Sequence, residues 1–510
     1  MRFYSKRTAL SGRLSRRRDL LSRHVIFVTA LAGGAFAYPA LGMDVASLVY
    51  PSCVLLTLTF VWILWSWFAL RGTLFEPYPI FMIVAGLFNG GQAVLAVFGL
   101  NTAGILAGRF SSKIVVESLF LVTISSAFLH CGALLAIGRK PGRNNGFDEA
   151  GPSRLYAARQ AGWILMAISF VPTVILFKQA FSQVMDNGYF ALYRGAQPVA
   201  PLIQVVSSFF IPGVIFLLVG SRRERTTKMF CSLSVAIYAG LGLFLGGRAT
   251  AMMVCVATAW SWDQSIRRIP WKVIVTAALV FLILIPLVKE TRRMSARDRS
   301  VVDLHDTLTK LDNPITASIS EMGESMDTIA YTIRLVPESR DFDYGVSYLY
   351  ALSNIVPNLG WSVHPSVAHG TLSDWLVKTV EPGTAAAGGG LGYSFLAEAY
   401  LNFGWFGAPL WMGIFGYFIA RVFLMADSGD PAKQALVASF LSFFLILPRG
   451  ESAFVVRAFA WYAMIPFLLA VVLTNVRGKR ITAVTFTCAR GAIPRRATAA
   501  VAKIVTLSRI

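Results

Sequence analysis

Two arginines and two glutamates lie at the ends of long apolar stretches. Arg248 follows two glycines in LGGRATA, and Glu398 belongs to GGGLGYSFLAEAY, where a run of glycines precedes an apolar segment. Arg449 and Glu451 are separated by one residue in LPRGE. An ionised side chain at the mouth of a membrane span is costly unless it is paired or faces water, so all four are functional candidates. Arginine suits phosphate groups, and glutamate can accept a proton from a hydroxyl.

Further ionisable residues are predicted at the same depth, at the outer ends of apolar segments that are far apart in the sequence. They are Glu117, Lys178, Lys289, Glu290, Arg292, Arg293 and Arg457. A layer of charges at one depth is typical of a water-accessible cavity for an anionic substrate. Salt bridges that only hold helices together are the alternative.

The composition indicates a membrane protein. Of the 510 residues, 55% are hydrophobic and only 14% are charged, whereas a soluble domain has about 25% charged residues. The net charge is +21, and eight basic residues lie in each of the segments 1–24 and 476–510. This basic excess flanks apolar segments, as the positive-inside rule predicts for cytoplasmic ends. Nucleic acid is therefore not an expected partner.

Hydropathy predicts an all-α polytopic membrane protein with about twelve transmembrane helices. The predicted spans are 25–42, 45–70, 78–100, 114–137, 160–182, 200–220, 229–245, 249–262, 271–288, 395–421, 434–449 and 452–475. Five regions follow: a basic cytoplasmic segment 1–24, spans 25–288, one large periplasmic loop 289–394 between the ninth and tenth helices, spans 395–475, and a basic cytoplasmic tail 476–510. Both termini are predicted to be cytoplasmic.

The seventh and eighth spans are short. Residues 229–262 number only 34, while two full crossings need roughly 40. The tip of this hairpin should therefore lie below the membrane surface. Arg248, at the tip, would then need an anionic partner, unless it reaches the interface as a snorkelling arginine.

The large loop is predicted to contain short helices. Residues 324–335 have helical spacing, and a second amphipathic helix precedes Pro357. His364 and His369 lie five residues apart, but no Cys pair or HExxH pattern accompanies them, so no metal site is expected. The five cysteines lie outside the loop, which excludes a disulfide framework there.

Six motifs in order resemble those of the O-antigen polysaccharide polymerases, the Wzy-type proteins. They are GGR in the hairpin, YTIRLVPE, DYGVSYLYAL, NIVPNLGW, GGGLGYSFLAEAYLNFGWFG and LPRGE, within residues 229–475. The resemblance implies an inner-membrane glycosyltransferase whose active site faces the periplasm. Such an enzyme moves a chain from polyprenyl diphosphate to a hydroxyl of the next lipid-linked repeat unit. The lipid-linked oligosaccharide and the bilayer are the implied partners, a chain-length regulator is a candidate partner, and no cofactor is expected.

The resemblance also implies roles for particular residues. Arg248, Arg334 and Arg449 match the motifs and are candidates to bind the diphosphate, with Arg292 and Arg293 as weaker additions. Glu398 and Glu451 are candidate general bases, followed by His369. Aromatic residues that can stack on sugar rings, or simply pack, are Tyr344, Tyr348, Trp361 and Tyr400.

Two other functions remain open from the sequence. An O-antigen ligase shares the architecture, although the order of motifs is nearer to that of a polymerase. A flippase of lipid-linked oligosaccharide would carry charges along the full membrane depth and consist of two similar halves. This sequence has no internal repeat and its charges lie on one side.

Overall fold

The computed structural model describes residues 2–37, 44–100, 104–137, 151–189, 192, 201–291, 313–356 and 361–489, and within these ranges it contains helices and no strands. Each of the twelve predicted spans coincides with helical structure. Nine helices in the described part of the chain are long and apolar enough to cross a membrane. The spans correspond to α1 (Arg2–Ala37), α2 (Val49–Arg71), α3 (Pro77–Val97), α4 (Ser112–Ala136), α5 (Pro152–Asn187), α6 and α7 (Pro201–Ser207 and Phe210–Gly220), α8 (Arg225–Phe244), α9 (Arg248–Ser265), α10 (Trp271–Thr291), α18 (Phe395–Phe423), α19 (Pro431–Phe444), and α20 to α21 (Ser452–Ala458 and Ile465–Ala489).

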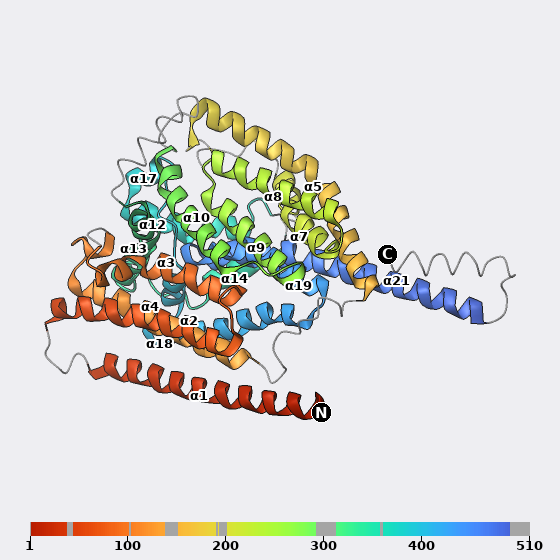
Figure 1. Ribbon diagram of the computed structural model, residues 1–510. Coiled ribbons are helices and arrows are strands. Elements are labelled where there is room, and N and C mark those ends of the chain that lie inside the picture. Colours follow the sequence, from red (N-terminus) through yellow and green to blue (C-terminus); the bar gives the residue numbers. More distant parts are fainter. Residues whose placement is uncertain are drawn as a thin grey trace.

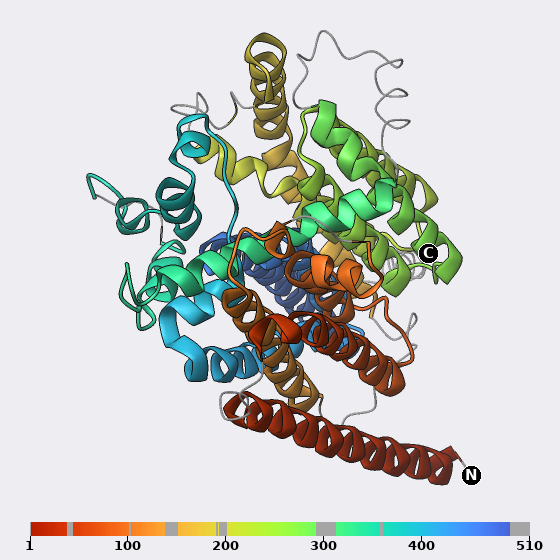
Figure 2. The same ribbon diagram turned by 90° about the vertical axis from the view of Figure 1, so that its left-hand side faces the viewer.

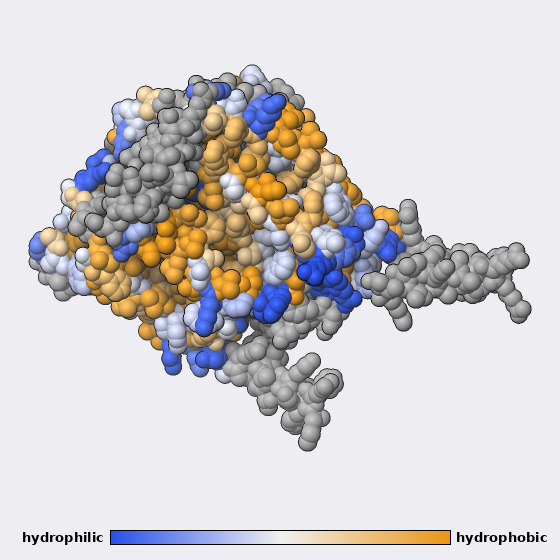
Figure 3. Space-filling model, turned by 45° about the horizontal axis from the view of Figure 1, so that its top comes forward, coloured by the Kyte–Doolittle hydropathy of each residue, from blue (hydrophilic) through white to orange (hydrophobic). Residues whose placement is uncertain are grey.

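The arrangement of these helices supports a bundle that crosses a membrane. In Figure 1 the N-terminal end of α1 and the C-terminal end of α21 lie on the same side of the molecule. The surface in Figure 3 shows a broad apolar area between two groups of hydrophilic residues. Exposed apolar side chains such as Ile168, Phe170 and Leu410 are more than half exposed, as expected for residues that face lipid.

The described part of the basic segment, residues 2–24, is helical and continuous with the first predicted span. A single helix, α1, runs from Arg2 to Ala37. Arg17 donates hydrogen bonds to the carbonyl oxygens of Leu134 and Leu135, at 3.2 and 3.0 Å. These carbonyls lack helical partners at the end of α4, so the arginine satisfies them and fastens α1 to the bundle.

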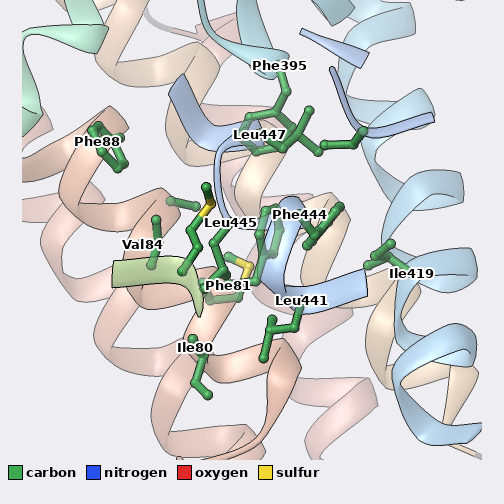
Figure 4. Packing of buried hydrophobic residues seen from close by; sticks show 14 of the residues in the cluster. Ile80, Phe81, Val84, Phe88, Phe395, Ile419, Leu441, Phe444, Leu445 and Leu447 are labelled. Atoms are coloured by element: carbon green, nitrogen blue, oxygen red, sulfur yellow. The ribbon is translucent and has the colours of Figure 1, made fainter. Parts of the chain in front are cut away.

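Close packing of small and aromatic residues holds the centre of the bundle together. A Cβ added at Gly132 of α4 would lie 1.9 Å from the carbonyl oxygen of Gly413 in α18, so only glycine permits this approach. Aromatic rings fill the space between α3, α18 and α19 (Figure 4): the ring of Phe81 lies 4.7 Å from that of Phe444 and 5.8 Å from that of Phe395. This packing fixes the start of α18, which carries Glu398, and the end of α19, which is followed by the short helix that contains Arg449.

The predicted outer loop folds onto the bundle. It contains α12 (Pro314–Gly323), α13 (Ser325–Leu335), α14 (Val346–Ser353), α15 (Pro365–His369), α16 (Leu372–Val380) and α17 (Pro382–Ala386). The two predicted loop helices correspond to α13 and α14. Polar residues of α3 hold α12 in place, since Gln92 donates to the carbonyl oxygen of Ser320 at 3.4 Å. In Figure 1, α12, α13 and α17 lie on the side opposite to the chain ends.

Candidate functional site

A cavity of about 640 Å³ opens beside the loop helices. It is formed where the tip of the α8–α9 hairpin, the end of α19, helices α12 and α16 and the glycine-rich segment 388–392 meet. Its ionisable lining residues are Arg248, Glu321, Asp374, Lys378 and Arg449. Apolar side chains complete the walls, namely Phe88, Leu243, Phe281, Leu284, Ile285, Met322, Val377, Ile446 and Phe454. Two predicted arginines and the predicted glycines thus meet in one place, although they are up to 200 residues apart.

Arg248 is positioned by a tight turn between α8 and α9. Gly246 adopts a φ of +86°, which favours glycine, and the N–H of Gly247 donates to the carbonyl oxygen of Gly242 at 2.7 Å. The guanidinium of Arg248 donates to the carbonyl oxygen of Ile285 at 2.8 Å and forms an ion pair with Glu321. Both side chains are only 12% exposed. The anionic partner expected for a recessed arginine is therefore present, and it comes from the loop.

Arg449 approaches the cavity from the end of a short 3-10 helix, Leu447–Arg449. Gly392 packs against it with a φ of +74°, and a Cβ at that position would lie 3.1 Å from the carbonyl oxygen of Arg449 and 3.3 Å from its Nε. Among the described residues, the Arg449 guanidinium makes no hydrogen bond or ion pair. Arg248 and Glu321 lie within electrostatic reach of it. Arg449 is thus a cation held at a cavity wall with its hydrogen-bond donors available.

Helix α16 contributes two residues that the sequence reasoning missed. Asp374 and Lys378 are four residues apart on α16, and both line the cavity. Thr371 caps the helix, with its side chain accepting a hydrogen bond from the N–H of Asp374 at 3.1 Å. Within the described residues, neither charged group of Asp374 or Lys378 has a hydrogen bond or ion pair. The T-x-x-D capping pattern was the available signal for this helix, but it does not indicate a cavity.

Glu398 lies in the first turn of α18 and is 1% exposed. Its carboxylate accepts hydrogen bonds from the hydroxyl of Ser347 at 3.0 Å, and from the N–H and hydroxyl of Ser452 at 2.7 and 2.6 Å. Ser452 is the first residue of α20, so the carboxylate satisfies a free N–H at the start of that helix. Glu398 does not line the cavity; it joins α18 to α20 and α14.

Glu451 plays a comparable part at the start of α16. Its Oε2 accepts a hydrogen bond from the N–H of Leu372 at 2.9 Å, and its side chain is buried. Burial raises the pKa of Glu451 to about 8; the Leu372 N–H opposes this rise and the nearby Glu398 carboxylate adds to it. Ser373 and Asp374, which follow Leu372 in α16, line the cavity. Glu451 itself lies behind them.

Comparison with known proteins identifies the family. The family model described as O-antigen polysaccharide polymerase Wzy matches residues 24–479, a range that includes every element around the cavity. The chain belongs to this family. No curated protein and no solved structure matches it. Wzy proteins are multi-pass membrane transferases of polysaccharide biosynthesis that polymerise O-antigen from lipid-linked repeat units.

Arg334, another arginine predicted for this Wzy-family site, lies elsewhere. Arg334 is exposed on α13, and its guanidinium lies over the rings of Tyr331 and Phe110, at 5.0 and 5.7 Å from their centroids. It does not line the cavity. Arg292 and Arg293 lie outside the described residues.

The four aromatic residues predicted to contact sugars do not line the cavity of this Wzy chain. The ring of Tyr348 packs 4.9 Å from that of Trp411, and the hydroxyl of buried Tyr400 donates to the carbonyl oxygen of Val336 at 3.3 Å. Tyr344 and Trp361 are 79% and 46% exposed. His369 stacks on Tyr350 at 4.1 Å. Within the described residues, no three His, Cys, Asp or Glu side chains are grouped to hold a metal ion.

Proposed function

We propose that this Wzy-family protein polymerises polyprenyl-diphosphate-linked oligosaccharide units at the periplasmic face of the inner membrane, and that the cavity binds the diphosphate of the donor. The observation that carries this proposal is Arg449, an arginine without a hydrogen-bond partner among the described residues at the wall of a cavity of about 640 Å³. Arginine binds phosphate oxygens in a bidentate manner. The facing Arg248 adds a second positive charge.

The reaction requires a site that stabilises the negative charge of the leaving diphosphate. The acceptor hydroxyl attacks the anomeric carbon of the growing chain, a new glycosidic bond forms, and the bond from that carbon to the diphosphate oxygen breaks. The diphosphate leaves on its lipid, and the hydroxyl proton passes to a base. Because negative charge develops on the departing diphosphate, arginines fixed in a partly buried cavity stabilise the transition state, typically by about 100-fold to 1,000-fold per donor.

We propose that Asp374 is the residue that contacts the acceptor hydroxyl. It is a cavity-lining carboxylate with no hydrogen bond or ion pair within the described residues, whereas Glu321 is paired with Arg248. Glu398 and Glu451, the candidates from the sequence, are occupied by helix N–H groups and act as positioning residues in this proposal. Asp374 can accept the proton directly or hold the hydroxyl in place.

The orientation of the protein in the membrane follows from its charges. The basic segments at both ends favour a cytoplasmic location for the termini. Because α12, α13 and α17 lie on the opposite side in Figure 1, this orientation exposes the cavity to the periplasm. A chain-length regulator that contacts the periplasmic helices would then be able to act on polymerisation.

The test uses the lipopolysaccharide ladder of a deletion strain. Deletion should leave lipopolysaccharide that carries one repeat unit and remove the longer chains; loss of every repeat unit would instead indicate a ligase or a flippase. Complementation with Arg449→Gln should fail at normal membrane abundance, since the cavity loses the guanidinium proposed to bind the diphosphate. Arg421→Gln is the matched control, because Arg421 is exposed at the far end of α18. A normal ladder from Arg449→Gln would refute the proposed diphosphate site.

A further inference from the structure

The loop contains a long stretch without charged residues. Between Tyr344 and Ser373 the sequence holds no Asp, Glu, Lys or Arg, although the loop from 289 to 394 has nine basic and thirteen acidic residues outside this stretch. The stretch forms α14 and α15. A segment of about 30 residues with no charge is unusual for a surface that faces water.

One face of α14 is apolar and exposed. Val346, Leu349 and Leu352 recur every three residues and are 41, 66 and 53% exposed, while Ser347 and Ala351 on the other face are buried. The apolar surface continues into the neighbouring segments. Its further exposed members are Tyr344, Val356, Trp361, Val363 and Val367. A contiguous apolar surface of this kind marks a site of interaction with lipid or protein.

A hydrogen bond to the last membrane span gives the depth of α14. The indole N–H of Trp461 donates to the carbonyl oxygen of Ile355 at 2.9 Å, just after α14 ends. Trp461 lies sixteen residues before Arg477, the end of that span, which is about 24 Å along a helix. If Arg477 marks the inner boundary of a hydrocarbon core about 30 Å thick, Trp461 and the bonded Ile355 lie roughly 6 Å inside its outer boundary.

A second contact joins α14 to the membrane-spanning part of another helix. The ring of Tyr348 on α14 lies 4.9 Å from that of Trp411 and 5.9 Å from that of Phe403 on α18. Trp411 lies ten residues before Arg421, the exposed charged residue in the last turn of α18, which is about 15 Å along a helix. Next to it, Phe406 and Leu410 are 71 and 59% exposed. Helix α14 therefore lies beside membrane-facing side chains.

The figures agree with this position. In Figure 1, α14 lies nearer to the side of the chain ends than α12, α13 and α17 do. Figure 2 looks at the molecule from the side of those three helices. There the teal segment that contains α14 and α15 stands out at the left edge, beyond the packed helices.

We infer that α14 and α15 are immersed in the membrane leaflet on the side of α12 and α13, with Val346, Leu349 and Leu352 facing lipid. The inference does not depend on the proposed function. Lipid is the occupant that the observations favour, because two independent contacts hold α14 inside the hydrocarbon boundary and the surface is uncharged. Tyr344, at one end of the exposed surface, and Trp361, within it, have the aromatic character of residues at the membrane interface. In that case these two residues anchor the segment at the membrane interface and do not bind sugars.

Fluorescence quenching in nanodiscs tests this inference. Single cysteines replace Leu349 or Leu352 in a variant whose five native cysteines are changed to alanine, and each is labelled with an environment-sensitive fluorophore. Leu410→Cys is the lipid-facing control and Ser339→Cys, on an exposed turn of the loop, is the water-facing control. Two quenchers are compared: iodide in water, and a phospholipid with a nitroxide near the start of its acyl chain.

Labels at both test positions should be quenched by the nitroxide lipid to within about twofold of the label at position 410. Their quenching by iodide should be about tenfold weaker than at position 339, because iodide does not enter the hydrocarbon core. Iodide quenching equal to that at position 339 would overturn the inference and identify a water-facing surface, as a protein partner would require. Two positions are used so that a local disturbance at one of them does not decide the result.

Discussion

Replacement of Glu398 by glutamine separates a positioning role from a catalytic one. The carboxylate accepts three hydrogen bonds, one from Ser347 and two from Ser452, in a site that is 1% exposed. A glutamine can keep its oxygen toward the Ser452 N–H, but its NH₂ group then meets two hydroxyls. The hydroxyl of Ser347 already accepts a hydrogen bond from Asn402 at 2.8 Å, which limits its ability to accept another.

At least one hydrogen bond to the carboxylate is therefore lost. A hydrogen bond to a charged group contributes about 1.5–3 kcal/mol to the free energy of unfolding. Part of this loss is offset because the cost of burying the charge is also removed. We expect Glu398→Gln to lower the free energy of unfolding by about 2 kcal/mol. Turnover per folded molecule should stay within about fivefold of the wild type, since a positioning residue does not take the proton.

The measurement is turnover of purified enzyme on lipid-linked repeat units, normalised to folded protein, together with thermal unfolding in detergent. Ser452→Ala is the matched control, because it removes one hydroxyl bond to the same carboxylate and leaves the carboxylate in place. The two variants should behave alike. A fall in turnover of about 100-fold or more for Glu398→Gln, with normal stability and near-normal Ser452→Ala, would identify Glu398 as the general base and refute this reasoning.

Three further predictions concern residues in the cavity walls or directly behind them. Arg248→Lys should keep the ion pair with Glu321 but lose the bond to the Ile285 carbonyl oxygen and the guanidinium fork, so activity in the ladder assay should fall by about tenfold or more; a normal ladder would contradict it. Gly392→Ala should lower activity more than abundance, because its φ of +74° costs about 1–2 kcal/mol and its Cβ would press on Arg449; equal losses of both would count against it. Glu451, with a pKa near 8, keeps its proton in the folded state and loses it in the unfolded state above about pH 4.5. Its contribution is therefore fully present below pH 4.5 and is lost as the pH rises through 8; Glu451→Gln should flatten the decline in melting temperature between pH 5 and 8.5, and parallel curves would refute this.

Much of the helical framework could be predicted from local sequence. Long apolar segments indicate membrane helices because only a helix satisfies every backbone group within the segment. The short hairpin around Gly246 was predictable from its length alone, and an anionic partner for Arg248 was one of the two possibilities that followed, the other being a snorkelling arginine. The identity of that partner was not predictable, since Glu321 lies 73 residues further along and nothing in its local sequence points to α9.

The packing of the loop onto the bundle was harder to predict. The run NGGQ at 89–92 lies within an apolar helix. It was the sequence signal that another segment packs closely against this helix. A Cβ at Gly91 would lie 2.8 Å from the carbonyl oxygen of Ile319, and Gln92 donates a hydrogen bond to the carbonyl oxygen of Ser320 in the loop. Such contacts depend on which distant segment fills the space, and hydrophobic periodicity does not contain that information. Asp374 was missed for the same reason.

The two buried glutamates explain how the cavity can keep a free cation. If Glu398 or Glu451 faced the cavity, its charge would pair with Arg449 and compete with the diphosphate for it. Instead, each carboxylate lies behind the lining and accepts a hydrogen bond from a helix N–H, that of Ser452 at the start of α20 or that of Leu372 at the start of α16. The partial positive charge at the start of α20 favours the Glu398 carboxylate at that position. The same contacts fix α16, which carries Asp374 and Lys378, against α20, which begins three residues after Arg449. Acidic residues that the sequence places close to the arginines can thus stabilise the helices around the cavity while the Arg449 guanidinium stays available to an anionic ligand.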